Sequence, residues 1–233
     1  MCELMTVTGD RSFALGPILN RAQRLETLGF AGYGWGVAWV TAAGLDYYKR
    51  PTSLAEDIEA KQSLAETEVL RALIHLRRPT DPTTISSADT QPFVDDARSF
   101  AFAHNGFFKL HHAFRGEFTD ELQGRGDTEV AFRMLAKSLR GGAPASESLV
   151  GIHEQLTGSA NCGYLGAAGE LLVYHSNTSN PCWTLTCEGL RVMVTGLHWP
   201  DRSGLDVLFP GLGAATRIER GVTELAKPVA GLR

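Results

Sequence analysis

Hydrophobic side chains recur along this chain with two different periods, and each period predicts a different kind of element. Apolar residues spaced three or four apart indicate amphipathic helices, which we expect at residues 17–28, 53–61, 127–140 and 146–156. Short apolar runs indicate strands, which we expect at residues 2–8, 34–41, 45–49, 69–77, 161–165, 171–175, 183–187, 192–196 and 216–219. Helices thus lie between two groups of strands, as in an α+β protein.

Cap and turn residues refine these boundaries. Ser53 and Asp127 begin helical patterns and are typical N-cap residues. The segment Phe100–Leu110 predicts two strands interrupted by a turn at residues 104–106, because asparagine followed by glycine favours a turn.

Alternation within the expected strand at 69–77 separates its side chains onto two faces. Leu73, His75 and Arg77 share one face, and Leu70, Ala72, Ile74 and Leu76 share the other. The strand therefore directs a histidine and an arginine to the same side.

Strands with apolar side chains on both faces need cover on both sides. Two antiparallel sheets packed face to face, with helices outside them, meet this need within one domain. We expect that domain to span residues 2–226, followed by a C-terminal tail at 227–233. The uncharged stretch from Thr27 to Leu45 contains five glycines and predicts a turn entering a buried strand rather than a membrane span.

Composition and charge narrow the classes of partner. The 233 residues include 22 Lys and Arg against 26 Asp and Glu, for a net charge of -4. Because there is no block of like charge, we expect no nucleic-acid and no membrane partner. The N-terminus lacks the basic and apolar regions of a signal peptide, so we expect a cytoplasmic protein. The cysteines, histidines and carboxylates do not occur at the spacings typical of metal-binding motifs in the sequence. We therefore expect neither a metal nor a cofactor.

Cys2 is the first candidate for chemistry. Removal of the initiator methionine would expose a thiol and a free amine on this one residue. An α-amine has a reference pKa of about 7.7 to 8.0, so at neutral pH it can accept the proton of its own side chain. A cysteine also occurs at this position by chance, so the interpretation needs partners elsewhere in the sequence.

Asn105 and Gly106 are candidate partners. An acyl-transfer site needs N–H donors aimed at the oxyanion, and this pair offers a side-chain amide beside a backbone N–H. Glycine also lets the backbone approach a reacting carbonyl closely. The alternative is an ordinary hairpin turn.

Four motifs, in this order, resemble those of the class II glutamine amidotransferases, a family of N-terminal nucleophile hydrolases. They are Cys2 itself, His75-Leu76-Arg77-Arg78-Pro79-Thr80 for His-x-Arg-x-x-Thr, Ala103-His104-Asn105-Gly106 for His-Asn-Gly, and Asp127-Thr128-Glu129 for Asp-[Ser/Thr]-Glu. Gly34-Trp35-Gly36 and Gln91-Pro92-Phe93 are weaker matches. The resemblance covers most of the chain and extends to stand-alone members that hydrolyse γ-glutamyl compounds in ergothioneine assembly and glutathione breakdown.

This resemblance implies a four-layer αββα sandwich and a set of site residues. Cys2 would be the nucleophile and its α-amine the general base, with Asn105 and the Gly106 N–H as the oxyanion hole. Arg77, assisted by Thr80, would bind the α-carboxylate of a γ-glutamyl substrate. Asp127 would pair with the α-ammonium group.

The charges of the implied binding residues suit a glutamyl group, whose α-end is a zwitterion. Arginine presents a planar fork that matches a carboxylate, which lysine cannot copy. A slip of one residue in the strand would make Arg78 the binding residue in place of Arg77. We expect His75 and His104 to orient neighbouring loops by hydrogen bonding, since the terminal amine already supplies the base.

Three positions depart from the family pattern. Glu3 follows the nucleophile where glycine is common, Asp89 stands where asparagine is often found, and Gln91 stands where histidine is usual. These departures concern the specificity for the leaving group. They remove neither the nucleophile, nor the oxyanion donors, nor the residues that would pair with the charges of the substrate.

Three functions are compatible with these residues. The first is hydrolysis of glutamine or another γ-glutamyl amide through a Cys2 thioester, releasing glutamate and an amine or ammonia. The second is a glutaminase subunit that passes ammonia to a separate acceptor or synthase subunit. The third is a non-catalytic protein that binds a glutamyl ligand.

Overall fold

The computed structural model describes residues 2–199, 201–210 and 212–232. Its strands are β1 (Glu3–Ala14), β2 (Trp35–Thr41), β3 (Gly44–Arg50), β4 (Glu68–Leu76), β5 (Phe93–Val94), β6 (Phe100–Phe108), β7 (Gly158–Gly166), β8 (Leu171–His175), β9 (Cys182–Cys187), β10 (Leu190–Thr195), β11 (Ala215–Arg217) and β12 (Gly221–Ala226). Its helices are α1 (Leu15–Gly29), α2 (Ile58–Leu64), α3 (His111–Arg115), α4 (Asp127–Arg140), α5 (Ala145–Leu156), α6 (Ser203–Leu208) and the short 3-10 helices η1 (Pro82–Thr84) and η2 (Gly116–Phe118).

The strands form two sheets in which every pair of neighbours is antiparallel. The first sheet has seven strands in the order β11-β9-β10-β1-β4-β2-β3, and the second has five in the order β12-β8-β7-β6-β5. Strands 2–8 and 69–77 of the sequence prediction thus become β1 and β4, which lie side by side at the centre of the first sheet.

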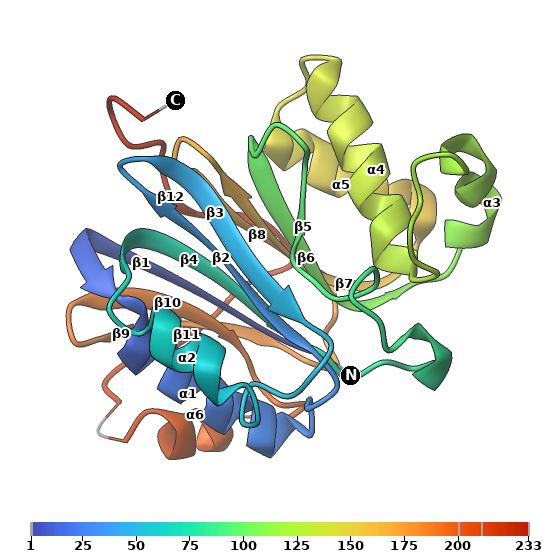
Figure 1. The fold of residues 1–233 in the computed structure, drawn as a ribbon. Coiled ribbons are helices and arrows are strands. Elements are labelled where there is room, and N and C mark those ends of the chain that lie inside the picture. The colour runs from blue at the N-terminus through green and yellow to red at the C-terminus, as the bar shows by residue number, and fades with distance from the viewer. Residues whose placement is uncertain (1, 200, 211, 233) are drawn as a thin grey trace.

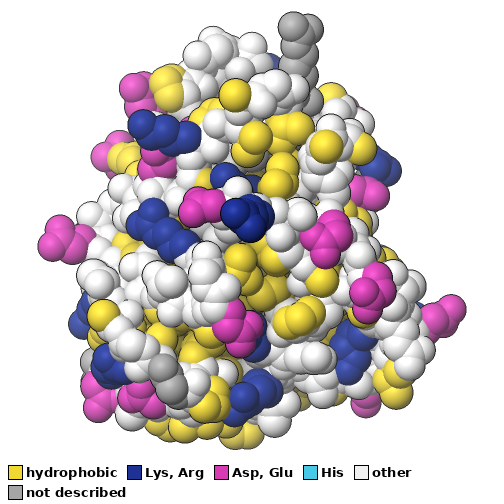
Figure 2. All heavy atoms as spheres, turned by 90° about the vertical axis from the view of Figure 1, so that its left-hand side faces the viewer, with side chains coloured by type: hydrophobic (Ala, Val, Ile, Leu, Met, Phe, Trp, Pro, Cys, Tyr) yellow, Lys and Arg dark blue, Asp and Glu magenta, His cyan; other side chains and the backbone are white. Residues whose placement is uncertain are grey.

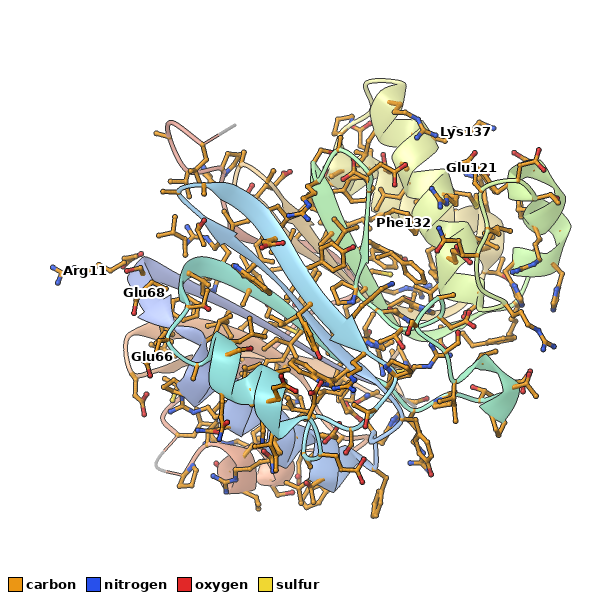
Figure 3. All side chains as sticks on the ribbon, viewed as in Figure 1. Arg11, Glu66, Glu68, Glu121, Phe132 and Lys137 are labelled. Carbon is orange, nitrogen blue, oxygen red and sulfur yellow. The ribbon has the colours of Figure 1, made fainter. Side chains whose placement is uncertain are left out.

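Helices cover the outer face of each sheet, so the molecule has four layers (Figure 1). Helices α1, α2 and α6 pack on the first sheet around buried residues such as Leu19 and Ile74. Helices α4 and α5 pack on the second sheet, where the Phe132 side chain stacks on Phe93 with ring centroids 5.5 Å apart (Figure 3). A third apolar cluster lies between the sheets. The αββα prediction is therefore confirmed.

Alternation along the central strands works as predicted. In β4, Ala72, Ile74 and Leu76 face the helices of the first layer, whereas Leu73 faces the second sheet. The uncharged stretch that contains β2 is also core, since β2 pairs with β3 on one side and β4 on the other.

The turn predicted at residues 104–106 is wrong. Strand β6 is continuous from Phe100 to Phe108 and pairs with β7 through the whole tripeptide, with Asn105 opposite Asn161. Gly106 keeps a positive φ of 147° inside this strand, and a Cβ there would lie 2.0 Å from the carbonyl oxygen of Ser159. The glycine is thus needed for close approach of β7 rather than for a turn.

Both predicted helix caps are wrong. Helix α2 begins at Ile58, and Ser53 instead accepts a hydrogen bond from the Glu56 N–H in the preceding turn, at 3.2 Å. Asp127 is the first residue of α4 and makes no side-chain cap, because Gly126 holds the N-cap position. The Ser53 bond is local and forms one turn before α2, whereas Asp127 is engaged by a tertiary contact with the Phe108 N–H.

Several short elements carried no clear signal in the sequence, among them α3, α6, β5 and β12. The chain after β12 contacts the second sheet, since the Val229 N–H donates to the Ala168 carbonyl at 2.7 Å. In the face that Figure 2 shows, Lys and Arg side chains are interspersed with Asp and Glu. Within the described residues, no helix is long and apolar enough to cross a membrane.

Candidate active site

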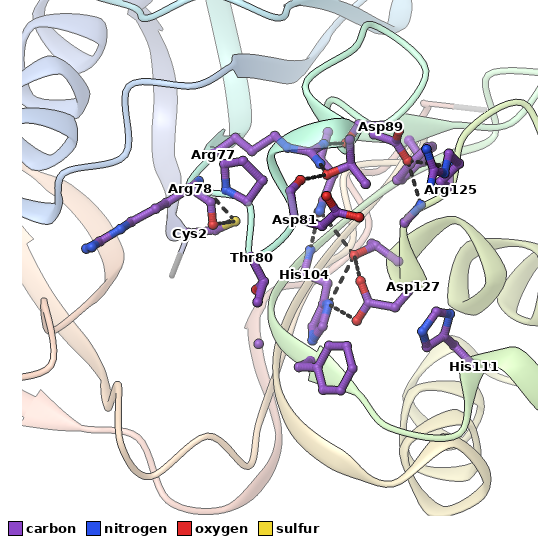
Figure 4. A pocket seen from close by; sticks show the side chains of 18 of the residues that line it. Cys2, Arg77, Arg78, Thr80, Asp81, Asp89, His104, His111, Arg125 and Asp127 are labelled. Atoms are coloured by element: carbon purple, nitrogen blue, oxygen red, sulfur yellow. Dashed lines mark hydrogen bonds and ion pairs between the residues drawn. The ribbon is translucent and has the colours of Figure 1, made fainter.

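A cavity of about 400 Å³ opens at the end of the sheets where β1 begins. Its walls come from the start of β1, the loop after β4, the end of β6, helix α3 and the loop before α4. Five of the six residues proposed from the sequence line it: Cys2, Arg77, Thr80, Gly106 and Asp127. Figure 4 shows Cys2 and Arg77 toward one end of the cavity and His111 at the other, with His104 and Asp127 between.

Cys2 lies just before the start of the central strand β1, at one end of the first sheet, and is half-buried. Its Sγ lies 3.4 Å from the backbone nitrogen of Arg78, which donates to it, and 3.7 Å from the carbonyl oxygen of the same residue. Burial raises the pKa of the Cys2 thiol above its ordinary value. A thiol in this environment is protonated at neutral pH and needs a base to become a nucleophile.

Asn105 approaches Cys2 from the second sheet. In β6, Ala101 and Ala103 face the first sheet, so alternation directs Asn105 to the same side and toward β1. Asn105 is fully buried, and its Nδ2 donates to the carbonyl oxygen of Cys2. The Asn105 side chain therefore contacts the backbone of Cys2 from inside the protein, and the next residue, Gly106, lines the cavity.

Arg77 supplies a buried cation to the cavity, with only 6% of its surface exposed. Backbone bonds to Tyr33 and Gly34 continue the strand pairing just past β4, which directs this side chain inward. Arg78 is exposed, and its guanidinium lies 5.8 Å from the ring centroid of Phe30. Arg78, Arg115 and Arg125 also line the cavity, but Arg77 is the arginine of this set that is buried in its wall.

The guanidinium of Arg77 is held by the loop that follows it. Nη1 donates to the carbonyl of Asp89, and Nη2 donates to Thr84 Oγ1 at 2.6 Å. Each Nη carries two hydrogens, so each retains one for a ligand. Burial lowers the pKa of Arg77 below its ordinary value, while Cys2, Asp89 and Asp127 act in the opposite direction.

Asp127 brings a carboxylate to the same cavity. Its Oδ2 accepts a hydrogen bond from the Phe108 N–H at 2.8 Å and lies 3.9 Å from Nδ1 of His104. The side chain is 18% exposed, so the carboxylate keeps acceptor capacity toward the cavity. Thr80 is exposed on the loop after Arg77 and completes this part of the wall.

The two histidines differ from each other. His104 is confirmed as a hydrogen-bonded residue, with Nδ1 3.1 Å from Thr128 Oγ1 and Nε2 3.3 Å from the Ser159 carbonyl. The role predicted for His75 stays a prediction: the backbone of His104 lies near the ring, although neither ring nitrogen meets strict hydrogen-bonding geometry with a described residue. Burial, followed by the charge of Arg77, lowers the pKa of His75 to about 3, so this ring is neutral packing between the sheets.

Asp89 is a buried residue of the cavity wall, and in the sequence it stood out only as a departure from the family pattern. It is 4% exposed, and its Oδ1 accepts from the backbone N–H groups of Arg125 at 2.8 Å and Gly126 at 2.6 Å. Its Oδ2 accepts from Ser86 Oγ at 3.1 Å. Asp89 therefore ties the loop that carries Arg77 to the loop that leads into Asp127.

Gln91, the other departure in this loop, connects two further elements. Its Oε1 accepts from the His104 N–H at 2.6 Å, and its Nε2 donates to Thr128 Oγ1 at 3.1 Å. The close approach of this loop to β2 needs Gly36, where a Cβ would lie 2.4 Å from the Gln91 carbonyl oxygen. The two weaker sequence motifs thus meet in space.

Three buried asparagines beside Asn105 carried no signal in the sequence. Asn161, Asn177 and Asn180 are at most 2% exposed and lie within hydrogen-bonding distance of Asn105, of each other or of Glu3. Across the residues that the structure describes, no three His, Cys, Asp or Glu side chains are grouped so as to hold a metal ion.

The fold is similar to solved amidotransferase structures. Glutamine phosphoribosylpyrophosphate amidotransferase from B. subtilis matches with a TM-score of 0.71 and 17% identity, over 96% of this chain and 48% of that one. A glutamine aminotransferase class-II domain protein from Silicibacter pomeroyi matches with a TM-score of 0.59 and 15% identity, over 96% of this chain and 98% of that one. A structure described as a predicted glutamine amidotransferase from Pseudomonas aeruginosa matches with a TM-score of 0.54 and 16% identity, over 97% and 100%.

This chain thus spans about half the length of the B. subtilis protein and nearly the whole length of the other two. At such identities the likeness shows a shared fold. No protein with a curated description matches the sequence. A family model described as Glutamine amidotransferases class-II matches residues 1–187, which include the strands, loops and helices that build the cavity. The chain belongs to the class II glutamine amidotransferases.

Proposed function

We propose that this protein hydrolyses the γ-amide bond of glutamine or of another γ-glutamyl compound, with Cys2 as the nucleophile once Met1 has been removed. The products are glutamate and an amine or ammonia. The observation that carries the proposal is the meeting of the Cys2 thiol, the buried Arg77 cation and the Asp127 carboxylate in one cavity.

The α-end of a glutamyl group fits the two charges of this cavity. Arg77 retains one free N–H on each Nη, which suits the two oxygens of an α-carboxylate. Asp127 can accept from the α-ammonium group, and Thr80 lies on the same wall to assist. With the zwitterion held there, the γ-carbonyl points back toward Cys2.

The raised pKa of the Cys2 thiol calls for a base next to it. The freed α-amine of Cys2 fills that role by taking the thiol proton as sulfur attacks the γ-carbonyl. Asn105 Nδ2 and the Gly106 N–H stabilise the oxyanion. The amine then gives its proton to the leaving nitrogen, the C–N bond breaks, and water hydrolyses the glutamyl thioester.

A second candidate, glutamine hydrolysis that supplies ammonia to a separate acceptor or synthase subunit, is favoured by one comparison. The B. subtilis amidotransferase uses this fold within a chain about twice as long. Turnover that rises strongly when an acceptor enzyme is added distinguishes this function from free-standing hydrolysis of γ-glutamyl compounds.

The test begins with intact mass, which establishes whether Met1 is absent. The protein is then treated with 6-diazo-5-oxo-norleucine, a glutamine-like electrophile, followed by peptide mapping, and its turnover is measured on glutamine and a panel of γ-glutamyl amides. We expect the label on Cys2 and loss of turnover in Cys2→Ala. Cys187→Ala is the matched control, since Cys187 is partly buried in the first sheet and does not line the cavity.

Label on another cysteine, or full turnover in Cys2→Ala, would overturn the proposal. Tight binding of glutamate without turnover in a protein that has lost Met1 would identify the third function, a non-catalytic glutamyl-binding protein.

A further inference from the structure

Three polar side chains form a row across the second sheet, on the face that looks toward the first sheet. Pairing between strands places Asn105 on β6 opposite Asn161 on β7, and Asn161 opposite His175 on β8 (Figure 1). All three residues are at most 2% exposed. Buried polar groups are costly unless they are hydrogen-bonded, so the partners of this row determine how each side chain is turned.

Asn161 is the centre of the row and uses both ends of its amide. Its Nδ2 donates to Oδ1 of Asn105 at 3.0 Å and to the carbonyl oxygen of Asn180 at 2.7 Å. Its Oδ1 accepts from the backbone N–H of Asn177 at 3.3 Å and lies 2.7 Å from Nδ1 of His175. These four contacts engage the whole amide.

Backbone groups determine which end of the Asn161 amide is oxygen and which is nitrogen. The Asn177 backbone N–H can only donate, and the Asn180 carbonyl can only accept. An amide turned the other way would oppose both groups at once, so one orientation is specified by the network. His175 then carries its proton on Nδ1, consistent with a neutral ring, because burial lowers the pKa of His175.

The same reasoning passes from Asn161 to Asn105. Because Asn161 donates an N–H toward Asn105, Asn105 has to accept with its Oδ1. Asn177 Nδ2 donates a second hydrogen bond to the same oxygen at 3.4 Å. The nitrogen of Asn105 is thereby turned toward Cys2, whose carbonyl accepts one of its two hydrogens. The other hydrogen remains for an oxyanion.

We propose that Asn161 is a positioning residue that holds the Asn105 amide with its N–H groups, and not its oxygen, facing the reacting carbonyl. A flipped Asn105 would set an oxygen against the developing negative charge and convert a stabilising contact into a repulsive one. This inference rests on the proposed function, since it assumes that an oxyanion forms beside Cys2.

Asn161→Leu tests the inference, because leucine is similar in size and cannot donate a hydrogen bond. Loss of one oxyanion donor typically lowers kcat by about 100- to 1000-fold. Asn161→Leu frees Asn105 to flip without removing it, so we expect kcat to fall by a smaller factor of about 10 to 100. KM and the Kd for glutamate should change by less than about threefold, because Arg77 and Asp127 lie on other elements. A general loss of structure would move both constants together.

Asn177→Leu is the graded comparison. It makes the same side-chain change at a similarly buried position, keeps the backbone N–H that orients Asn161, and removes only the 3.4 Å contact to Asn105. We expect a loss in kcat of less than about fivefold, the effect of one weak hydrogen bond. Asn161→Asp provides a second test in case Asn161→Leu folds poorly. It keeps the shape of the side chain but directs an acceptor oxygen toward Asn105, so it should lower kcat at least as much as Asn161→Leu.

A double-mutant cycle separates positioning from structural damage. If Asn161 acts through Asn105, Asn161→Leu should have no further effect on kcat in the Asn105→Ala background. An equal loss in both backgrounds, or wild-type kcat in both Asn161 variants, overturns the inference. Cys2→Ala is assayed in parallel: turnover that does not depend on Cys2 overturns the proposed function itself, whereas Cys2-dependent turnover unaffected at Asn161 overturns only this inference.

Discussion

The two sides of the cavity are built in different ways. The proposed oxyanion side lies on paired strands, where Asn105, Gly106 and Asn161 occupy β6 and β7 and the two asparagine side chains are fully buried. The proposed substrate side lies largely on loops. Arg77 follows β4 and donates to the Asp89 carbonyl, and the Asp89 side chain accepts from the backbone of Arg125 and Gly126 before α4.

This difference matches the demands of the two tasks. An oxyanion site has to hold its N–H groups within about 0.5 Å of their productive positions, and paired strands with a buried amide network provide that rigidity. A substrate site has to admit a ligand, and its residues have to differ between proteins that act on different leaving groups. Loops held by single residues such as Asp89 allow both. Substitutions on the strand side should therefore alter kcat, and those on the loop side KM.

The largest expected effect is on the strand side. Asn105→Ala should lower kcat about 100- to 1000-fold, or about 2.7 to 4 kcal/mol of barrier, because one oxyanion donor is lost. KM should stay nearly constant. Steady-state kinetics checks this, with thermal unfolding to show that the variant is folded. A variant with raised KM and unchanged kcat would contradict the division between the two sides.

The pH dependence of stability tests how completely water is excluded from Glu3, the first residue of β1 and the neighbour of Cys2. Glu3 is fully buried beside Cys2, and burial raises its pKa to about 7 although Thr195 and Asn180 donate to it. Since the folded pKa lies above the unfolded value of 4.5, the folded state favours the protonated form. The stabilisation contributed by protonated Glu3 is therefore fully present below about pH 4.5. It is lost as the pH rises from there through about 7, by about 3 kcal/mol in all.

Glu3→Gln should remove this loss. In urea unfolding, the variant should gain stability relative to wild type as the pH is raised from 5 to 8. Glu66→Gln, at an exposed position, is the matched control and should show no such gain. A constant difference between wild type and Glu3→Gln across this range would mean that Glu3 does not titrate in the folded protein.

Arg77→Lys examines the loop side. Lysine retains the charge but loses the planar fork, together with the geometry that donates to Asp89 and Thr84. Charge-assisted hydrogen bonds contribute about 1.5 to 3 kcal/mol, so we expect KM to rise about 10- to 100-fold with a smaller change in kcat. Arg11→Lys is the control at an exposed arginine that does not line the cavity, where a surface substitution should alter KM by about twofold at most.

Asp89→Asn should have the smallest effect. The amide oxygen can still accept from Arg125 and Gly126, but these bonds lose their charge, and Ser86 loses its acceptor. A loss of about 1 kcal/mol would raise KM about fivefold and leave kcat unchanged. Titration with glutamate provides the independent measurement, and an unchanged Kd would show that Asp89 does not hold the binding loops.

Sequence reasoning succeeded where the relevant contacts are local or periodic. Alternation in the strand at 69–77 correctly separated Leu73 from Ala72 and Ile74, because strand geometry alone sets the two faces. It failed at residues 104–106, where asparagine and glycine have strong turn propensity but nine residues of pairing with β7 keep the strand extended. Cross-strand hydrogen bonds outweighed the local preference.

The asparagine network lay beyond the reach of sequence reasoning. Asn161 and Asn177 are 56 and 72 positions from Asn105, and no local period connects them. An asparagine in a strand is equally compatible with an exposed edge, so burial of both partners became visible only once β6, β7 and β8 were aligned.

By itself the sequence determined the kinds of element, the two faces of each strand and the identities of the groups available for chemistry, because propensity, alternation and side-chain charge are properties of the chain alone. Tertiary structure decided which of those groups meet: Cys2 with Asn105 across two sheets, Arg77 with Asp89 within one loop, and Asn161 with Asn105 across neighbouring strands. Such meetings depend on strand register and sheet packing, which arise from the summed burial of residues far apart in the chain.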